Sequence, residues 1–162
     1  MKIRPVKATD VHALVEIYNH YIKHSTATFE EEAVSEEIFL ARINKVEHVG
    51  LPWLVCERDG VVVGYAYAGR WNERSAYRFT VESSIYVAHN MAGKGVATAL
   101  YSALLTSLKS LGIKHVLGVV TLPNPASCAL HQRFGFKQVG EFASVGYKFD
   151  KWLSVSYWQL QL

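Results

Sequence analysis

Two glycines separate a strand-like run from a helix-like run in the stretch His89-Asn90-Met91-Ala92-Gly93-Lys94-Gly95-Val96-Ala97. Segment 83–87 before them has the residue types of a strand, and the apolar periodicity of a helix begins at Val96. Glycine allows a backbone turn with outward N–H groups, and a helix N-terminus attracts anions. The segment therefore predicts a phosphate site for a ligand that carries a pyrophosphate.

Two well-known phosphate motifs do not fit this loop. A P-loop requires G-x-x-x-x-G-K-[ST], which the residues around Gly93 and Gly95 do not supply. A dinucleotide fingerprint requires a small residue where Thr98 stands, and an acidic residue about 20 positions further on. Residues 83–140 contain no Asp or Glu, but they do contain lysines and arginines. This composition disfavours a dinucleotide-dependent oxidoreductase and favours an anionic ligand whose ribose no carboxylate holds.

Glu82 and His131 are the candidates for moving protons. Glu82 lies within an apolar and hydroxyl-bearing strand, where a carboxylate is costly unless it has a partner or a task. From the residues alone, a catalytic and a structural role for Glu82 are equally well supported. Histidine titrates near neutral pH, although a lone histidine on a helix is more often a packed or surface residue. We therefore carry both residues as candidates for acid–base chemistry.

Arg70, Arg74 and Arg78 recur every four residues. The residues between them predict a loop between strands rather than a helical stripe. Such a loop is ordinarily a solvated basic surface, but guanidinium groups also fit carboxylate and phosphinate oxygens. The arginines are therefore candidates for recognising an anionic group of a substrate.

The composition excludes several classes of protein. The 162 residues, half of them hydrophobic and 19% charged, are typical of one globular domain over 1–162. A net charge of +3 without a Lys/Arg cluster argues against nucleic acid as a partner. Cys56 and Cys128 lie in apolar contexts without metal-ligand spacing, so we expect reduced thiols and no metal. No signal-like N-terminus and no apolar run near ~20 residues occur, so we expect a cytoplasmic protein without a membrane partner.

Periodicity and turn signals predict the elements that must position these residues. We expect strands over 3–6, 53–57, 61–68, 79–88, 114–121, 137–149 and 153–162. We expect helices after Thr9 or Asp10, after Ser35, at Val96 and at Pro125. The continuous apolar character of 114–121 predicts a central strand. The order β-α-α-β-β-β-α-β-α-β-β predicts an α/β fold in which helices flank a mixed sheet.

This order, with the glycine loop after the fourth strand, resembles the GNAT superfamily of N-acetyltransferases, whose central sheet is mixed and mostly antiparallel. The family signature Q/R-x-x-G-x-G/A is similar to segment 90–95, with Asn90 in place of Gln or Arg. The family block N-x-x-A/S-x-x-x-Y-x-x-x-G-F is similar to segment 124–136, with His131 where many members have tyrosine. Segments along most of the chain resemble the phosphinothricin and methionine-sulfoximine N-acetyltransferases, among them Asn19-His20-Tyr21-Ile22, Pro52-Trp53-Leu54-Val55, Thr80-Val81-Glu82-Ser83 and Val145-Gly146-Tyr147-Lys148-Phe149.

The resemblance implies a homodimeric enzyme that uses acetyl-CoA as co-substrate. The acceptor would be the α-amine of phosphinothricin, methionine sulfoximine or methionine sulfone. Glu82 would be the base, and His131 would be either the acid for the departing thiolate or a second base. The implied substrate-binding residues are Phe29, Arg74, Tyr77 and Arg78. The implied cofactor-binding residues are Ile85, Tyr86, Val87, Gly93, Lys94, Gly95, Val96, Ala97, Thr98 and Asn124.

Two other functions remain open on the same fold. A GNAT enzyme could acetylate another amine, such as an amino acid, a polyamine or a protein N-terminus. Polyamines would favour an acidic pocket, against which the arginines argue. A non-catalytic acyl-CoA-binding sensor would be favoured by the loss of both Glu82 and His131, and both are present.

Overall fold

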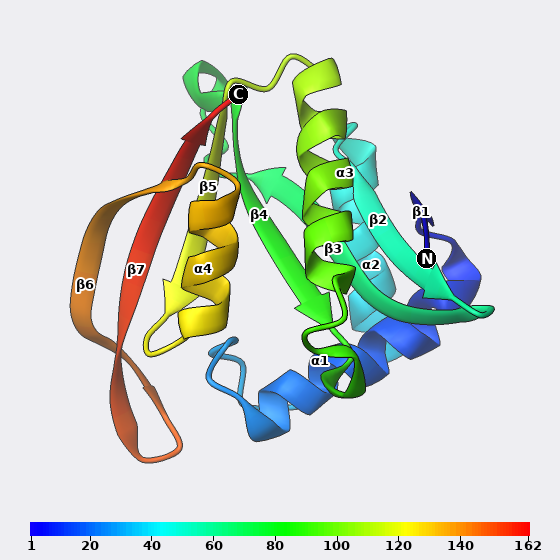
Figure 1. The fold of residues 1–162 in the computed structure, drawn as a ribbon, viewed down its shortest axis with the longest axis horizontal. Helices are drawn as coiled ribbons and strands as arrows, with labels where there is room; N and C mark the ends of the chain where they lie inside the picture. Colours follow the sequence, from blue (N-terminus) through cyan, green and yellow to red (C-terminus); the bar gives the residue numbers. More distant parts are fainter.

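Seven strands form one open sheet in the order β1-β2-β3-β4-β5-β7-β6 in the computed structural model, which describes residues 1–162 (Figure 1). The strands are β1 (Lys2–Pro5), β2 (Trp53–Arg58), β3 (Val61–Arg70), β4 (Thr80–Val87), β5 (His115–Thr121), β6 (Lys137–Lys148) and β7 (Lys151–Gln161). Only β4 and β5 pair in parallel, and every other neighbouring pair is antiparallel. The predicted α/β architecture, the order of its elements and the central place of β5 are confirmed.

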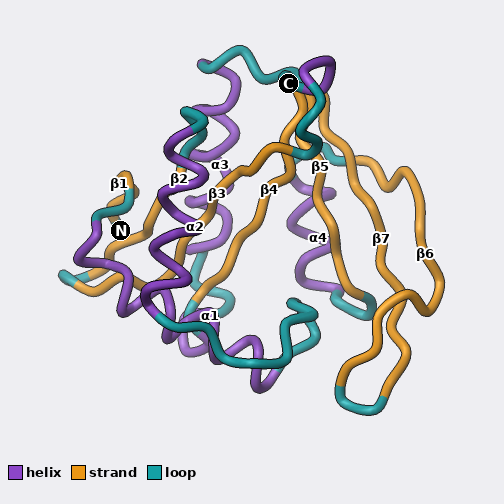
Figure 2. Tube along the Cα trace, turned by 180° about the vertical axis from the view of Figure 1, so that it is seen from behind, coloured by secondary structure: helices purple, strands orange, loops and turns teal.

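Four helices cover the two faces of the sheet. They are α1 (Val11–His24), α2 (Glu36–His48), α3 (Val96–Ser110) and α4 (Pro125–Arg133), with short 3-10 turns η1 (Ala8–Asp10), η2 (Ser75–Tyr77) and η3 (His89–Met91). Helices α3 and α4 lie in front of the sheet in Figure 1, and the reverse view of Figure 2 brings α1 and α2 forward. We refer to these as the α3 face and the α1 face. None of the helices is both long enough and apolar enough to cross a membrane.

The predicted helix starts are confirmed by their caps, with one difference at α1. The Ser35 hydroxyl accepts the amide of Ile38 at 3.2 Å, and the Asn124 side chain accepts the amide of Ser127 at 3.1 Å. Asp10 precedes α1 but makes no side-chain cap for it. Its carboxylate instead accepts two hydrogen bonds from the Arg4 guanidinium, at 2.7 and 2.9 Å, and one from the backbone amide of Lys7 at 2.8 Å, which caps the preceding turn η1.

Apolar stripes of the helices bury the two faces of the sheet. Leu100, Leu104 and Leu108 of α3 are fully buried on one face, and Leu14 and Ile22 of α1 are buried on the other. These residues belong to one core cluster that runs through the sheet. The core therefore fixes which side of each central strand faces which helix layer.

Strands β4 and β5 separate after a short stretch of pairing. Their partners are Thr80 with His115, Val81 with Val116, and Glu82 with Leu117. Beyond Glu82, β4 continues beside β3 only, whereas β5 continues beside β7 (Figure 1). A gap therefore opens in the middle of the sheet, next to the start of α3.

Candidate active site

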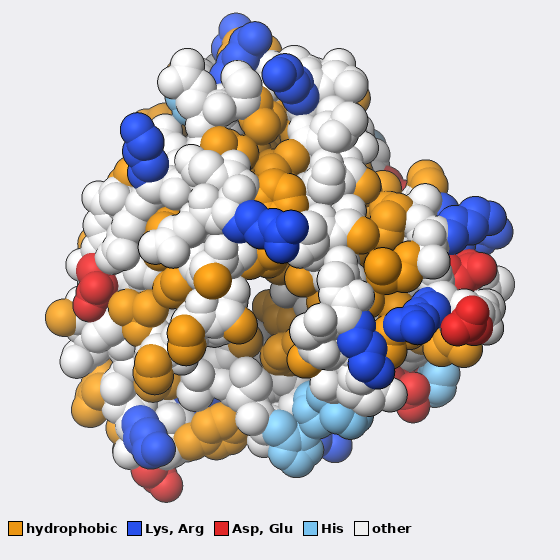
Figure 3. Space-filling model, viewed as in Figure 1, with side chains coloured by type: hydrophobic (Ala, Val, Ile, Leu, Met, Phe, Trp, Pro, Cys, Tyr) orange, Lys and Arg blue, Asp and Glu red, His pale blue; other side chains and the backbone are white.

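A cavity of about 990 Å³ occupies the gap between β4 and β5, and Figure 3 shows the molecule hollowed at its centre. Its walls come from five parts of the chain. They are the loop after α1 (25–29), the part of β4 from Glu82 onward (82–87), the start of α3 with the segment before it (91–93 and 95–98), the end of β5 (119–121), and the segment with α4 (123–127, with 130, 131 and 133). Single side chains of α1, α3 and β7 complete the lining, namely Tyr21, Tyr101 and Val155. Phe29, Glu82, His131 and Asn124, predicted from the sequence as site residues, thus line one space.

The glycine loop begins α3 at one end of this cavity. Gly93 and Gly95 have φ angles of +74° and +79°, which favour glycine because a side chain strains this conformation. Gly95 is the N-cap of α3, and no side chain caps that helix. Gly93, Gly95, Val96, Ala97 and Thr98 line the cavity, whereas Lys94 does not. The positive end of a 15-residue helix therefore faces the cavity and suits an anion.

Two further features suit a long polar ligand that continues from this loop. Ile85, Tyr86 and Val87 line the cavity where β4 has lost its pairing with β5, so this edge of the strand is free. Asn124 lines the cavity while its side chain caps α4. Arg133, which the sequence reasoning did not single out as a site residue, is the one lysine or arginine in the lining.

Glu82 lies on the α1 face of β4. Side chains alternate along a strand, and Tyr86 of the same strand packs its ring against Tyr18 and Tyr21 of α1. Glu82, four residues before Tyr86, therefore shares its face. Burial raises the pKa of the Glu82 carboxyl above its ordinary value, because desolvation disfavours the charged form. A carboxylate with a raised pKa is a stronger base than an ordinary glutamate.

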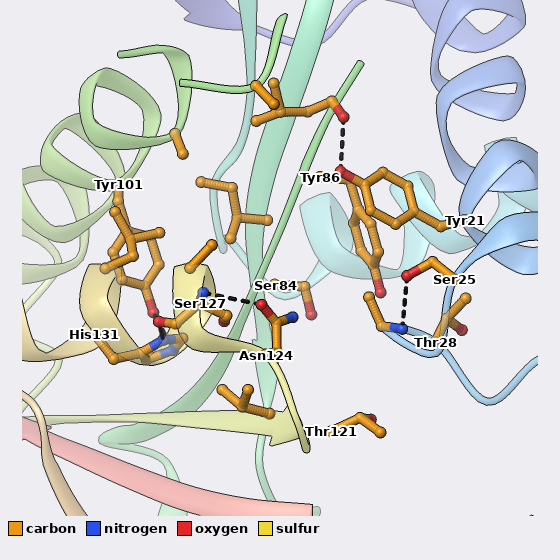
Figure 4. Close-up of a pocket in the computed structure, with 18 of the residues that line it drawn as sticks. Tyr21, Ser25, Thr28, Ser84, Tyr86, Tyr101, Thr121, Asn124, Ser127 and His131 are labelled. Atoms are coloured by element: carbon orange, nitrogen blue, oxygen red, sulfur yellow. Dashed lines mark hydrogen bonds between the residues drawn. The ribbon is translucent and has the colours of Figure 1, made fainter. Parts of the chain in front are cut away.

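His131 lies on the α3 face and is held in a hydrogen-bonded string (Figure 4). Its Nδ1 is 2.7 Å from the carbonyl oxygen of Ser127, which can only accept, so Nδ1 carries the proton. Its Nε2 then accepts from the Tyr101 hydroxyl at 3.3 Å, and that hydroxyl lies 2.7 Å from the Ser83 hydroxyl. Burial lowers the pKa of the His131 imidazole, so the ring is neutral at neutral pH.

Glu82 and His131 therefore lie on opposite faces of the sheet, and no hydrogen bond joins them, although both line the cavity. Ser83, adjacent to Glu82, points toward Tyr101 of α3, as alternation along β4 requires. In Figure 4, Tyr101 and His131 lie on one side of the cavity, and Tyr21 and Tyr86 lie on the other. The sequence reasoning missed Tyr101 and Ser83. A hydroxyl-bearing residue beside the apolar stripe of α3 was the signal that could have found Tyr101.

The predicted substrate residues divide into two groups. Phe29 lines the cavity, but Arg74, Tyr77 and Arg78 do not. Tyr77 packs edge-on against Trp71, with ring centroids 5.0 Å apart, in the exposed loop between β3 and β4. Arg78 donates to the Ser75 carbonyl at 3.0 Å and lines a smaller cavity of about 300 Å³ with Arg70. In this chain, the arginines and Glu82 are thus not parts of one lining.

Comparisons with known proteins agree with this geometry. The model of the acetyltransferase (GNAT) family matches residues 14–136. The phosphinothricin N-acetyltransferase of Streptomyces viridochromogenes is 40% identical over 159 residues, which cover 98% of this chain and 86% of that protein. The L-methionine sulfoximine/L-methionine sulfone acetyltransferase of Salmonella typhimurium is 38% identical over 163 residues, which cover 100% of this chain and 95% of that protein.

A solved structure of a relative contains the co-substrate. It is a GNAT superfamily phosphinothricin acetyltransferase from Sinorhizobium meliloti in complex with AcCoA. It matches this chain with a TM-score of 0.96 and 35% identity, and the match covers 99% of this chain and 88% of that one.

Proposed function

This chain belongs to the GNAT family of acetyltransferases, and we propose that it acetylates the α-amine of small amino-acid analogues. The enzyme is an acetyl-CoA-dependent N-acetyltransferase. Its proposed acceptors are phosphinothricin, methionine sulfoximine and methionine sulfone, which the names of two relatives support. The observation that carries the proposal is one cavity that joins the glycine loop of α3 to Glu82 through the β4–β5 gap.

The geometry supports a division of the cavity into a cofactor side and an acceptor side. The pyrophosphate would bind at Gly93–Thr98, where the N-terminus of α3 faces the cavity. The pantetheine arm would follow Ile85–Val87 along the free edge of β4, which brings the thioester into the gap. The acceptor amine would approach from the α1 face, where Glu82 lies.

Glu82 would then take a proton from the acceptor ammonium. The freed amine nitrogen forms a bond to the acetyl carbon, and the carbon–sulfur bond breaks with its electron pair leaving on sulfur. The nitrogen then gives its second proton to the thiolate, so that the amide and the free thiol of CoA are formed. A thiol has a pKa of about 8.5, so a thiolate is a stable leaving group that a nearby O–H donor suffices to stabilise. We place the string Ser83–Tyr101–His131 on the side of that sulfur. The Tyr101 hydroxyl, whose proton points to Nε2 of the neutral His131 in the structure, would turn that proton to the thiolate. We propose that His131 orients the Tyr101 hydroxyl and does not itself donate a proton.

Phe29 would contact the short aliphatic chain of the acceptor, because its ring lines the cavity on the α1 side. Arg74, Tyr77 and Arg78 stay proposed contacts for the carboxylate or the tetrahedral polar group of the acceptor. The exposed position of their loop means that these contacts require the loop to approach the cavity mouth when the acceptor binds.

We also propose that the enzyme is a cytoplasmic homodimer, with an interface on the β6–β7 hairpin. Strand β6 is the edge of the sheet, and apolar side chains of this hairpin are exposed. They are Val139, Phe142, Val145, Tyr147, Phe149 and Trp152. Sedimentation of Trp152→Glu against wild type tests this interface, since a buried charge at its centre would shift the protein to a monomer.

The acceptor assignment is tested by release of free thiol from acetyl-CoA across a panel of amines. We expect the three analogues to be turned over with higher kcat/KM than spermidine, ordinary amino acids or a peptide with a free N-terminus. A peptide amine or spermidine that exceeded all three analogues would overturn the acceptor class and leave the acetyltransferase intact.

A further inference from the structure

Lys148 is a buried cation at the end of an otherwise exposed strand. Its side chain is 1% exposed, whereas nearly every other residue of β6 is exposed. Its Nζ donates to the carbonyl oxygens of Ser25 and Thr28, each at 2.8 Å. Burying an ammonium is costly unless hydrogen-bond acceptors or opposite charges surround it. The fold therefore keeps this contact despite the desolvation cost of the ammonium, although no step of the proposed reaction uses Lys148.

Gly146, two residues earlier on the same face of β6, contacts the same loop. A Cβ atom built at Gly146 would overlap the ring of Phe29. The aromatic ring therefore lies directly on the backbone of the hairpin, which only glycine permits at this position. Phe29 thus has the hairpin on one side and the cavity on the other.

The loop that these two residues hold forms one wall of the cavity. Ser25, Thr26, Ala27, Thr28 and Phe29 all line it. The next residue, Glu30, is anchored elsewhere, by two hydrogen bonds from Arg42 of α2 at 2.8 and 2.5 Å. The Tyr18 hydroxyl of α1 also bonds the Thr28 side chain at 2.9 Å. Helices thus fix the side of the loop away from the hairpin, and Lys148 and Gly146 fix the side toward it.

We propose that Lys148 and Gly146 are positioning residues that hold the loop 25–29, which we call the acceptor wall, in place. The β6–β7 hairpin would thereby determine which acceptors fit. This inference rests on the proposed function, because it takes the α1 side of the cavity as the acceptor site. Two ammonium bonds fix the path of the loop backbone, and the missing side chain at 146 sets the depth at which the Phe29 ring lies. Selectivity for the length of the acceptor side chain follows from that depth, since pockets discriminate by single methylene groups.

The first test substitutes Gly146→Ala, with Gly140→Ala as the matched control. Both glycines lie in β6 with φ angles that alanine accepts, but a Cβ at Gly140 meets nothing within 4 Å. We expect Gly146→Ala to lower kcat/KM for the acceptor by about 10-fold to about 100-fold, the scale of a misplaced binding group. The dissociation constant of acetyl-CoA, measured by calorimetry, should stay within about 2-fold of wild type, because the glycine loop of α3 is untouched.

A double substitution separates positioning from a general loss of structure. In a Phe29→Ala background the overlap no longer exists, so Gly146→Ala should have little further effect on kcat/KM. Equal effects of Gly146→Ala with and without Phe29 would overturn the role of Gly146. So would a Gly140→Ala effect as large as that of Gly146→Ala.

The second test removes the ammonium with Lys148→Met, which replaces the aliphatic part of the lysine side chain and lacks its charged group. Hydrogen exchange of the amides at 25–29 should become faster, while exchange at 96–110 in α3 stays as in wild type. This readout does not depend on the acceptor. Faster exchange in an enzyme that turns over none of the three analogues would refute the acceptor assignment and keep the positioning role. Unchanged exchange together with an unchanged acceptor KM would refute the role of Lys148. If Lys148→Met fails to fold, the proposal is decided by the kinetics of the Gly146→Ala variant with and without Phe29→Ala.

Discussion

The two sides of the cavity are built in different ways. The cofactor side consists of consecutive backbone, from β4 through the glycine loop into α3, so its geometry is local in sequence. The acceptor side consists of side chains from distant segments, and the bond from Lys148 to the Ser25 carbonyl spans 123 residues. A binding site made of backbone atoms suits a co-substrate that is the same in every enzyme of the family. A site lined by side chains can differ from one enzyme to another on the same fold, because side chains differ in sequence. The comparison predicts that substitutions on the two sides change different kinetic constants.

The largest expected effect is on the cofactor side. Gly95→Asp puts a carboxylate at the phosphate site and strains a residue with φ of +79°, so acetyl-CoA affinity should fall by about 1000-fold. Calorimetry on the folded variant measures this loss. Gly112→Asp is the matched control, because Gly112 has φ of +78° at the other end of α3, away from the cavity. Unchanged binding in Gly95→Asp would place the cofactor elsewhere.

Glu82→Gln should lower kcat by about 100-fold, the scale of losing a general base, and leave acetyl-CoA affinity unchanged. Only the deprotonated carboxylate is a base, so wild-type activity should fall as pH drops through the pKa of Glu82. Because burial raises that pKa, the acidic limb should lie above the ordinary 4.5 of glutamate and vanish in Glu82→Gln. A limb that persists unchanged in Glu82→Gln belongs to another group.

Tyr101→Phe should lower kcat by about 10-fold, and His131→Ala should do so to a similar extent, because each interrupts the string on the sulfur side. If the residues act as one unit, the double variant should be no slower than the slower single variant. Steady-state rates for the three variants measure this. Additive losses would mean that His131 and Tyr101 act independently, and His131 would then regain a direct role in proton transfer.

The smallest effects are expected in the loop between β3 and β4. Arg74→Ala and Arg78→Ala should raise the acceptor KM, and at least one should lower kcat/KM by about 10-fold, as losing a charged hydrogen bond does. Acetyl-CoA affinity should not change in either variant. Arg70→Ala is the matched control, since Arg70 shares the smaller cavity with Arg78. Wild-type kinetics in both Arg74→Ala and Arg78→Ala would mean that only residues of the main cavity contact the acceptor.

Features that depend on neighbouring residues could be predicted from the sequence, whereas contacts between distant segments could not. The element order, the helix starts at Ser35 and Pro125 and the central place of β5 were all predictable, because periodicity and caps act over a few residues. The glycine loop was predictable for the same reason. The place of Arg74 and Arg78 outside the main cavity lining was not, since a loop's path depends on what it packs against. Thr9 or Asp10 was expected to cap α1, but the Asp10 carboxylate pairs with Arg4 and caps the turn η1, a choice that only the folded neighbourhood decides.

By itself, the sequence determined the sheet, the helices and the glycine turn before α3, because each depends on the backbone preferences of adjacent residues. It also supplied Glu82 and His131 as residues able to move protons. Only the tertiary structure decided that these two residues face opposite sides of the sheet, and that Tyr101 connects His131 to Ser83. Only the tertiary structure brought Lys148 and Gly146 against the loop 25–29. Contacts of this kind arise when separate elements pack on a common core, and no local pattern in the chain encodes which side chains then meet.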